Sequence, residues 1–170
     1  MNTVLRYPGS KWRIADQLVS NIPEHKSYLE PYFGSGAVLF NKPPSPIETI
    51  NDLDDDVINL FQCIRNHSQQ LAAMIAAIPY SRKVYDSQFS IVSKDPVDKA
   101  CAFLIKCWQG YGFKTSGIKT GWKRDKTGRE RAYNLSNWYH LPEWIEEIAE
   151  RLRNIQIEHK PALDLIREFD

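Results

Sequence analysis

Cysteines are few in this sequence, long apolar runs are absent, and neither sign of charge dominates. The three cysteines, Cys63, Cys101 and Cys107, include no Cys-x-x-Cys pair, which argues against a disulfide framework and against a zinc site. We therefore expect no bound metal and a reducing, cytoplasmic location. Because no stretch of about 18 apolar residues occurs, we expect no membrane span. The N-terminal residues also lack the apolar centre and the cleavage pattern of a signal peptide.

The balance of charge restricts how the chain could bind nucleic acid. The 170 residues include 22 Lys and Arg and 21 Asp and Glu, which leaves a formal net charge of +1. This excludes binding driven by overall charge, but it leaves room for a local basic patch. With 42% hydrophobic and 12% aromatic residues, the chain has enough apolar material for one folded domain.

Apolar periodicity and turn residues predict three short strands that alternate with helices. The strands are expected at 27–33, 47–53 and 155–159. Helices are expected at 11–21, 36–40, 56–64, 71–78, 85–92, 96–109, 140–152 and from 161 onward, with N-caps at Ser10, at Asp54 or Asp55, and at Asp95. Strands connected through helices are typical of a parallel α/β sheet. The glycine-rich, basic and aperiodic stretch 110–136 is expected to form a long loop or a hairpin.

The most informative stretch joins the first expected strand to a turn with two glycines. Gly34 and Gly36 let backbone N–H groups come close to a ligand, and the helix start that follows favours negative charge. The alternative is a tight strand-to-helix turn that binds nothing. Asp52 ends the next expected strand, where an acidic residue typically accepts hydrogen bonds from the ribose hydroxyls of a nucleotide cofactor. Alone, Asp52 is more typical of a helix cap, but the two features together favour a nucleoside-type cofactor.

A second feature is the local excess of basic residues between 114 and 131. This stretch holds seven Lys or Arg residues and two acidic residues, with Tyr111, Phe113, Trp122 and Tyr133 inside or beside it. Lys and Arg neutralise phosphates, and aromatic rings stack on or wedge between bases. The stretch therefore indicates a nucleic-acid contact, while a merely solvated loop is the alternative.

Three segments follow one another in an order that is typical of one family. They are residues 5–11 (LRYPGSK), residues 30–38 (EPYFGSGAV) and residues 51–54 (NDLD), the last with INLF following at 58–61. Together they resemble the Dam-type DNA adenine N6-methyltransferases, whose pattern is an aromatic–x–Gly–x–Lys turn, an acidic–Pro–aromatic–x–Gly–x–Gly turn and an acidic strand end. The chain departs from this pattern at Asp54, where the family often has Asn. The resemblance spans the whole chain, strongly over 1–66 and weakly over the helical middle.

The resemblance implies an α/β fold with a partial, Rossmann-like sheet of an S-adenosylmethionine-dependent methyltransferase. Residues 1–56 and 154–170 would form this cofactor-binding part, and residues 57–153 a helical insertion that recognises DNA. The implied cofactor is S-adenosyl-L-methionine, with Tyr7 packed against it, Lys11 beside it as a donor and Asp52 on its ribose. The implied cofactor-binding residues are Tyr7, Lys11, Glu30, Pro31, Phe33, Gly34, Gly36 and Asp52. Without the family, Tyr7 and Lys11 would be a helix-entry turn with a solvated lysine.

The resemblance also implies a reaction and a partner. The reaction is transfer of a methyl group to N6 of adenine in duplex DNA, in a bacterial or phage-encoded cytoplasmic protein. The implied DNA-binding residues are Arg6, Lys119, Lys123, Arg124, Lys126 and Arg129. A nicotinamide-dependent Rossmann enzyme is disfavoured, because Leu39 stands where the third glycine of Gly-x-Gly-x-x-Gly would be.

The sequence lacks the tetrapeptide that does the chemistry in this class, an Asp or Asn followed by Pro-Pro and an aromatic residue. Its one Pro-Pro pair, Pro43-Pro44, follows Lys42 and precedes Ser45. We therefore assign no catalytic residue and expect the chain to be an N-terminal portion that is inactive by truncation. The alternative is a truncated, non-catalytic module that binds DNA or the cofactor.

Truncation would also expose one strand. In the family's sheet the first strand lies inside, so its edge would be open here, with the apolar side chains of Tyr28, Leu29, Tyr32 and Phe33 exposed. An open apolar edge is a template for another chain. We therefore expect self-association, or pairing with a C-terminal fragment, through this strand.

Overall fold

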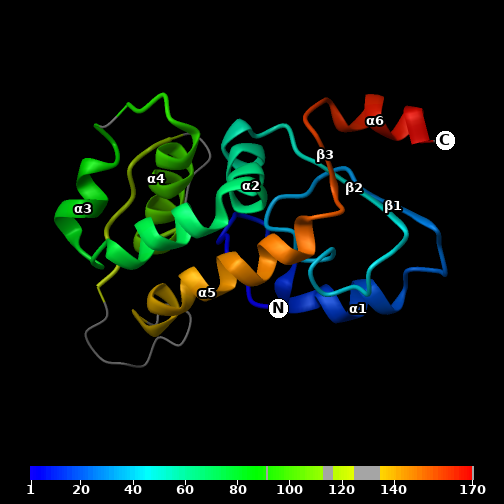
Figure 1. Cartoon of the computed structure of the whole chain (residues 1–170), viewed down its shortest axis with the longest axis horizontal. Coiled ribbons are helices and arrows are strands. Elements are labelled where there is room, and N and C mark those ends of the chain that lie inside the picture. Colours follow the sequence, from blue (N-terminus) through cyan, green and yellow to red (C-terminus); the bar gives the residue numbers. More distant parts are fainter. Residues whose placement is uncertain (91, 113–116, 125–134, 170) are drawn as a thin grey trace.

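The structure, a computed structural model, describes residues 1–90, 92–112, 117–124 and 135–169. Figure 1 shows a sheet with short helices at one end of the molecule and a group of longer helices at the other. The elements are η1 (Trp12–Ile14), α1 (Ala15–Ser20), β1 (Ser27–Glu30), β2 (Ile47–Asn51), α2 (Asp55–Ala77), α3 (Arg82–Ser87), α4 (Pro96–Gln109), α5 (Leu135–Leu152), β3 (Gln156–Glu158) and α6 (Ala162–Phe169). Among these helices none is both long enough and apolar enough to cross a membrane.

Three parallel strands form the sheet, in the order β1-β2-β3 (Figure 1). The register pairs Tyr28 with Glu48 and Ile50 with Ile157. The predicted parallel α/β arrangement is confirmed as a small mixed α/β fold, and β1 lies at one edge of the described sheet. The expectation of an exposed apolar edge is confirmed for Tyr32, which is 71% exposed, and wrong for Phe33, which is only 3% exposed. Its ring packs edge-on against Phe61 of α2, with 4.7 Å between the centroids.

The two helices expected at 56–64 and 71–78 are both present and run together as α2. It passes through a kink at His67, where φ is −137° and ψ is 31°. The sequence between the two expected helices contains neither proline nor glycine, so no residue there forces the helix to end. Ile64 before the kink and Leu71 after it are both buried, because the apolar face of α2 continues across the kink.

Helix caps agree with the sequence at two of three positions. Asp54 caps α2 by accepting a hydrogen bond from the backbone N–H of Asp56, and Asp95 caps α4, which begins at Pro96. Ser10 does not cap a helix, because its hydroxyl pairs with that of Ser35 at 2.9 Å and α1 begins only after a 3-10 turn. A side chain held by a distant loop is not available to a local cap.

Two expected helices are shorter or absent. Residues 36–40 form a turn in which Phe40 N–H donates to Gly36 O at 3.0 Å, without a regular helix. The helix expected at 85–92 is α3, which begins earlier and ends at Ser87. Both segments lie in short connections, where a few tertiary contacts outweigh helix propensity.

The core lies where α2 packs between α4 and α5, and it continues beneath the sheet. The largest fully buried side chains include Trp138, Tyr85 and Phe61. Arg65 of α2 reaches the chain just before β3 and donates to the carbonyl oxygens of Ile155 at 3.0 Å and Arg153 at 3.2 Å. The helices and the sheet are thus connected by polar contacts as well as by apolar packing.

A buried ionic cluster also joins α5 to the sheet. Glu48 of β2 accepts hydrogen bonds from Lys42 Nζ at 2.6 Å and from Arg151 Nη2 of α5 at 2.8 Å. The side chain of Glu48 is 3% exposed. Burial raises the pKa of Glu48, but the hydrogen bonds from Arg151 and Lys42 outweigh it, so its pKa lies below the ordinary glutamate value.

Replacing this carboxylate tests the cluster. Glu48→Gln should lower the free energy of unfolding by about 3 kcal/mol, because Lys42 and Arg151 would stay buried without a negative partner. The contribution of Glu48 is present above the ordinary glutamate pKa and is lost as the pH falls through its lower pKa in the folded protein. Urea denaturation at neutral and acidic pH measures both effects.

The control is Glu150→Gln, which removes an ion pair with Arg153 whose side chains are 71% and 70% exposed. Its loss should stay within about 1 kcal/mol. Equal losses in the two variants would contradict a stabilising role for the buried cluster.

Candidate functional site

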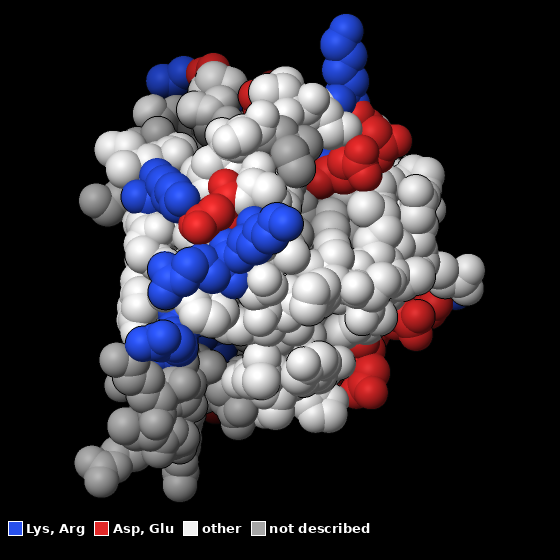
Figure 2. All heavy atoms as spheres, turned by 90° about the vertical axis from the view of Figure 1, so that its left-hand side faces the viewer, with Lys and Arg blue, Asp and Glu red and all other residues white. Residues whose placement is uncertain are grey.

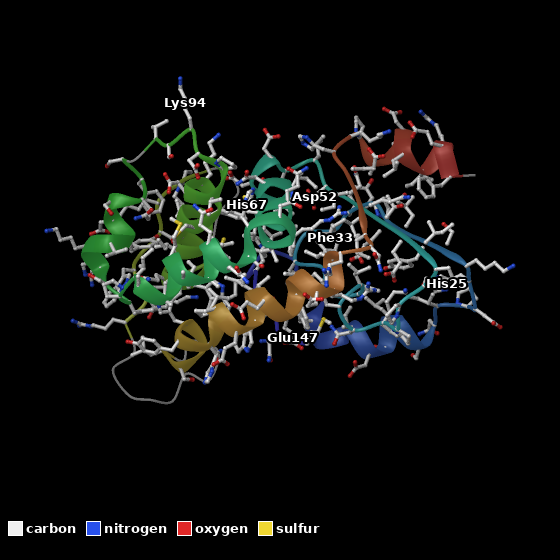
Figure 3. The ribbon with its side chains drawn as sticks, viewed as in Figure 1. His25, Phe33, Asp52, His67, Lys94 and Glu147 are labelled. Atoms are coloured by element: carbon white, nitrogen blue, oxygen red, sulfur yellow. The ribbon has the colours of Figure 1, made fainter. Side chains whose placement is uncertain are left out.

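A cavity of about 360 Å³ opens at the carboxyl ends of β1 and β2, which is where ligands bind in open α/β sheets. The N-terminal turn, the glycine turn after β1 and the end of β2 enclose it. Figure 3 shows Phe33 and Asp52, which belong to its wall, near the middle of the molecule. Its lining residues are Tyr7, Pro8, Gly9, Ser10, Lys11, Glu30, Tyr32, Phe33, Gly34, Ser35, Ala37, Val38 and Asp52. We call this space the first cavity.

Asp52 holds two loops of the first cavity together. One carboxylate oxygen accepts the backbone N–H of Gly34 at 2.7 Å, and the other accepts that of Asp54 at 3.0 Å. Gly34 adopts a φ of +52°, in the left-handed region that favours glycine. The alternative in which Asp52 caps the following helix is wrong, because Asp54 is the cap.

Asn51, which sequence reasoning did not single out, ties the three strand ends together. It is fully buried, and its side-chain amide donates to the carbonyl oxygens of Pro31 and Lys160, each at 3.0 Å. Its side-chain oxygen accepts the N–H of Lys160 at 3.0 Å. The strand that it ends, IETIN, already contains Glu48 and Thr49, so no local pattern in the sequence marked Asn51 as a buried polar residue.

Glu30 places a carboxyl group in the wall of the first cavity. Its Oε2 accepts hydrogen bonds from Tyr28 Oη at 3.1 Å and from the backbone N–H of Leu39 at 3.0 Å. Burial raises its pKa to about 7, against the opposing effect of these two hydrogen bonds and of the Lys42 charge. Glu30 therefore changes its charge near neutral pH, beside the space that a ligand would fill.

Tyr7 and Lys11 enter the first cavity from the N-terminal turn. The hydroxyl of Tyr7 donates to Asp54 Oδ2 at 2.7 Å, and burial, followed by this hydrogen bond, raises the pKa of Tyr7 above its ordinary value. Lys11 is exposed, and its Nζ donates to the carbonyl oxygen of Gly9 at 2.6 Å. The wall thus offers one aromatic ring and one exposed cation on the same side.

Two of the predicted cofactor residues do not line the first cavity. The carbonyl oxygen of Pro31 accepts a hydrogen bond from Asn51. Gly36 has a φ of +68°, and a Cβ there would come within 2.3 Å of the Phe40 ring and 2.5 Å of the Phe33 ring. Close packing against these two rings therefore accounts for the glycine at position 36 without a ligand.

A second cavity of about 640 Å³ adjoins the first one, and its wall includes the basic residues Arg6, Arg13 and Lys123. Its lining residues are Thr3, Leu5, Arg6, Tyr7, Pro8, Ser10, Trp12, Arg13, Cys107, Gly112 and Lys123. Three of them, Tyr7, Pro8 and Ser10, also line the first cavity. The N-terminal turn is thus a wall shared by the two cavities.

Lys123 and Arg6 bring positive charge to the second cavity. Lys123 is only 5% exposed, and its backbone N–H donates to the carbonyl oxygen of Gln109 at 2.8 Å. Burial, and then the charge of Arg6, lowers the pKa of Lys123 to about 8. The guanidinium of Arg6 lies 4.1 Å from the ring centre of Trp108, a cation–π distance. Lys123 thus faces a cavity and not the open surface of a loop.

The other predicted DNA-binding residues are distributed differently. Lys119 is exposed and pairs with Asp86 of α3 at 2.8 Å, and Arg124 is exposed. Lys126 and Arg129 lie outside the described residues. Figure 2, which faces the end formed by α3 and α4, shows Lys and Arg side chains gathered over this face. An antiparallel bridge between Gly110 and Trp122 gives the expected loop a hairpin-like base.

Comparison with known proteins matches this chain to methyltransferases. A family model described as D12 class N6 adenine-specific DNA methyltransferase matches residues 7–167. The chain is 26% identical over 117 residues to a DNA N-6-adenine-methyltransferase of Escherichia phage P1, covering 64% of this chain and 15% of that protein. It is 28% identical over 83 residues to the type II methyltransferase M.MjaIII of Methanocaldococcus jannaschii, covering 44% and 29%. The chain thus matches only a minor part of the length of each relative.

The two glycines of the turn allow a matched test of its packing. Gly34→Ala should cost about 1–2 kcal/mol of unfolding free energy for its positive φ, since its Cβ would meet only Tyr7 Cδ1 at 3.5 Å. Gly36→Ala carries the same backbone cost and also overlaps the Phe33 and Phe40 rings, so we expect about 1–3 kcal/mol more. Urea denaturation of both variants measures the difference, and equal losses would show that ring packing does not require Gly36.

Proposed function

The chain belongs to the D12 class of N6 adenine-specific DNA methyltransferases, and from this membership we propose that it binds S-adenosyl-L-methionine and duplex DNA for methyl transfer to N6 of adenine. We assign to the parts of the chain the roles that the family resemblance implies. Residues 1–56 and 154–170 hold the cofactor, and residues 57–153 recognise DNA. The protein would act in the cytoplasm of a bacterium, or of one infected by a phage, where its substrate DNA lies.

One observation carries the cofactor proposal: six of the eight residues that the resemblance implies line a single cavity at the strand ends. They are Tyr7, Lys11, Glu30, Phe33, Gly34 and Asp52. The volume of about 360 Å³ lies within the range of small-molecule sites, about 300–1,000 Å³. Residues brought together from three distant segments support a shared ligand better than any one motif does.

The chemical groups that line the first cavity suit this cofactor. The Asp52 carboxylate can accept from ribose hydroxyls while it keeps its backbone hydrogen bonds, because each carboxylate oxygen accepts more than one. Glu30, when ionised, suits the cationic methionine end, and the Tyr7 ring offers an apolar face to the adenosine. When bound, S-adenosylmethionine supplies a methyl group on a positively charged sulfur, and the residues of the chain bind and orient it.

The second cavity supports DNA binding beside the cofactor. Arg6 and Lys123 line it, Arg124 follows Lys123 on the exposed side of the hairpin, and cationic side chains bind phosphates. Lys119, Lys126 and Arg129 remain part of this proposal. Because the two cavities share Tyr7, Pro8 and Ser10, a nucleotide in the second cavity would lie next to the cofactor.

Transfer itself needs a group that this sequence does not supply. The exocyclic amine of adenine is a weak nucleophile because its lone pair is delocalised into the ring, so an oxygen acceptor must position it. No Asp/Asn-Pro-Pro-aromatic turn occurs in the 170 residues. We therefore propose that these residues bind cofactor and DNA and transfer no methyl group alone. Labelled methyl incorporated into adenine by the purified chain would overturn this.

The second candidate function, a non-catalytic binding module, predicts no transfer even when a polypeptide with such a turn is added.

Calorimetric titration with S-adenosylmethionine tests the cofactor site. The affinity should rise between about pH 6 and about pH 8, because an ionised Glu30 attracts the cationic cofactor and its pKa is about 7. Glu30→Gln should remove this part of the pH dependence and leave only the titration of the cofactor itself. Glu24→Gln, at an exposed position, should behave as the unaltered chain. No binding at any pH, or tighter binding of NAD, would contradict the proposed site.

Salt dependence tests the DNA-binding residues. With about four phosphate contacts, the slope of log affinity against log salt should be about −3 to −4 for random duplex DNA. Arg124→Gln should reduce the magnitude of this slope by about 1. Arg167→Gln, an exposed arginine of α6 outside the proposed DNA-recognition part, is the control and should leave the slope unchanged. An unchanged slope in Arg124→Gln would show that this arginine is merely solvated.

A further inference from the structure

The wall between the two cavities is a short stretch of chain, residues 4–10, which we call the dividing segment. Tyr7, Pro8 and Ser10 line both cavities, whereas Arg6 lines only the second. The N-terminal stretch, dark blue in Figure 1, lies near the middle of the molecule, between the helical end and the sheet. A ligand that fills either cavity would therefore reach the same three residues of this segment.

Contacts from the sheet side hold one half of the dividing segment. Tyr7 Oη donates to Asp54 Oδ2 at 2.7 Å, and Ser10 Oγ lies 2.9 Å from Ser35 Oγ. Asp54 caps α2, and Ser35 belongs to the glycine turn. These contacts set the position of the segment relative to the first cavity.

Trp108 of α4 holds the other half. Its indole Nε1 donates to the carbonyl oxygen of Val4 at 2.8 Å, and its side chain is buried, with 3% exposed. The guanidinium of Arg6 lies over the same indole ring, 4.1 Å from its centre. One side chain of the helical part thus binds the backbone at one end of the segment and sets the place of a cation in the second cavity.

We propose that Trp108 is a positioning residue that holds the dividing segment in the one conformation that both cofactor and DNA require. The inference rests on the proposed function, because it needs both ligands. If the segment is ordered for only a fraction of the time, each ligand alone binds more weakly by that fraction. Once either ligand is bound, the segment is ordered and the other ligand binds at full strength.

This arrangement makes a quantitative prediction for Trp108→Phe, which keeps an aromatic face for Arg6 and removes the hydrogen bond to Val4. Loss of one buried hydrogen bond should weaken the binding of S-adenosylhomocysteine and the binding of a short adenine-containing duplex by the same factor, about fivefold. Saturation with one ligand should restore the affinity for the other, so the variant gains a coupling of about fivefold that the unaltered chain lacks. Calorimetric titrations of each ligand, with and without the other, measure all four constants.

Trp138→Phe is the matched control. Trp138 is also buried, and its Nε1 also donates to a backbone carbonyl, that of Ile78 at 3.1 Å, but it does not contact the dividing segment through this bond. Trp138→Phe should leave the affinities for both ligands and the coupling between them unchanged. Titrations are run at a temperature where circular dichroism shows each variant to be folded, so that unfolding does not imitate the expected weakening.

The outcomes separate the inference from the function on which it rests. The role of Trp108 would be overturned if the variant bound only one ligand more weakly, or if the second ligand did not restore the affinity for the first. Equal effects in Trp138→Phe would overturn it as well. Failure of the unaltered chain to bind either ligand would overturn the proposed function and the inference with it. If Trp108→Phe does not fold, hydrogen exchange of the unaltered chain decides. Either ligand alone should slow exchange of the amides of residues 4–7, and slowing by only one ligand would contradict a shared segment.

Discussion

The Asp52 carboxylate is the contact on which the geometry of the candidate site depends. It accepts one hydrogen bond from the glycine turn after β1 and another from the residue that caps α2. The loops that follow β1 and β2 are therefore held at a fixed distance from each other. Tyr7 is positioned in turn by its hydrogen bond to Asp54, the residue that caps α2. Without a carboxylate at this strand end, two backbone N–H groups would need other partners. The first cavity is thus formed by the backbone of two loops that one side chain holds together.

The second constraint is the way in which the helical part is attached to the sheet. Polar contacts from three helices cross between them, among them Arg151 of α5 with Glu48 of β2, Arg65 of α2 with the chain before β3, and Trp108 of α4 with Val4. Each comes from a different helix, and two of them end on backbone oxygens. This attachment places the basic second cavity directly against the first cavity, with residues 4–10 between them. The proposed function, in which a cofactor meets a nucleic acid, requires that the two binding spaces be adjacent.

Local features were predictable from the sequence because they depend on neighbouring residues. The caps at Asp54 and Asp95, the three parallel strands and the glycine turn follow from residue types at short spacing. Predictions were wrong where a distant segment intervened. Ser10 pairs with Ser35 instead of capping a helix, and Phe33 is buried against α2. In each of these cases the deciding partner is remote in sequence, and no short pattern encodes it.

The sequence by itself determined the glycine turn and the acidic strand end at Asp52 that indicate a nucleoside-type cofactor, and the family resemblance added Tyr7, Lys11 and Glu30 to that prediction. Only the tertiary structure decided that Pro31 and Gly36 stay outside the first cavity, because their surroundings are made by Asn51, Phe33 and Phe40. It likewise decided that Lys123 faces a buried space and that Trp108 holds the wall between the cavities. The physical reason is that burial and hydrogen-bond partners are properties of packed surfaces, which segments about a hundred residues apart, such as Val4 and Trp108, form only when the chain has folded.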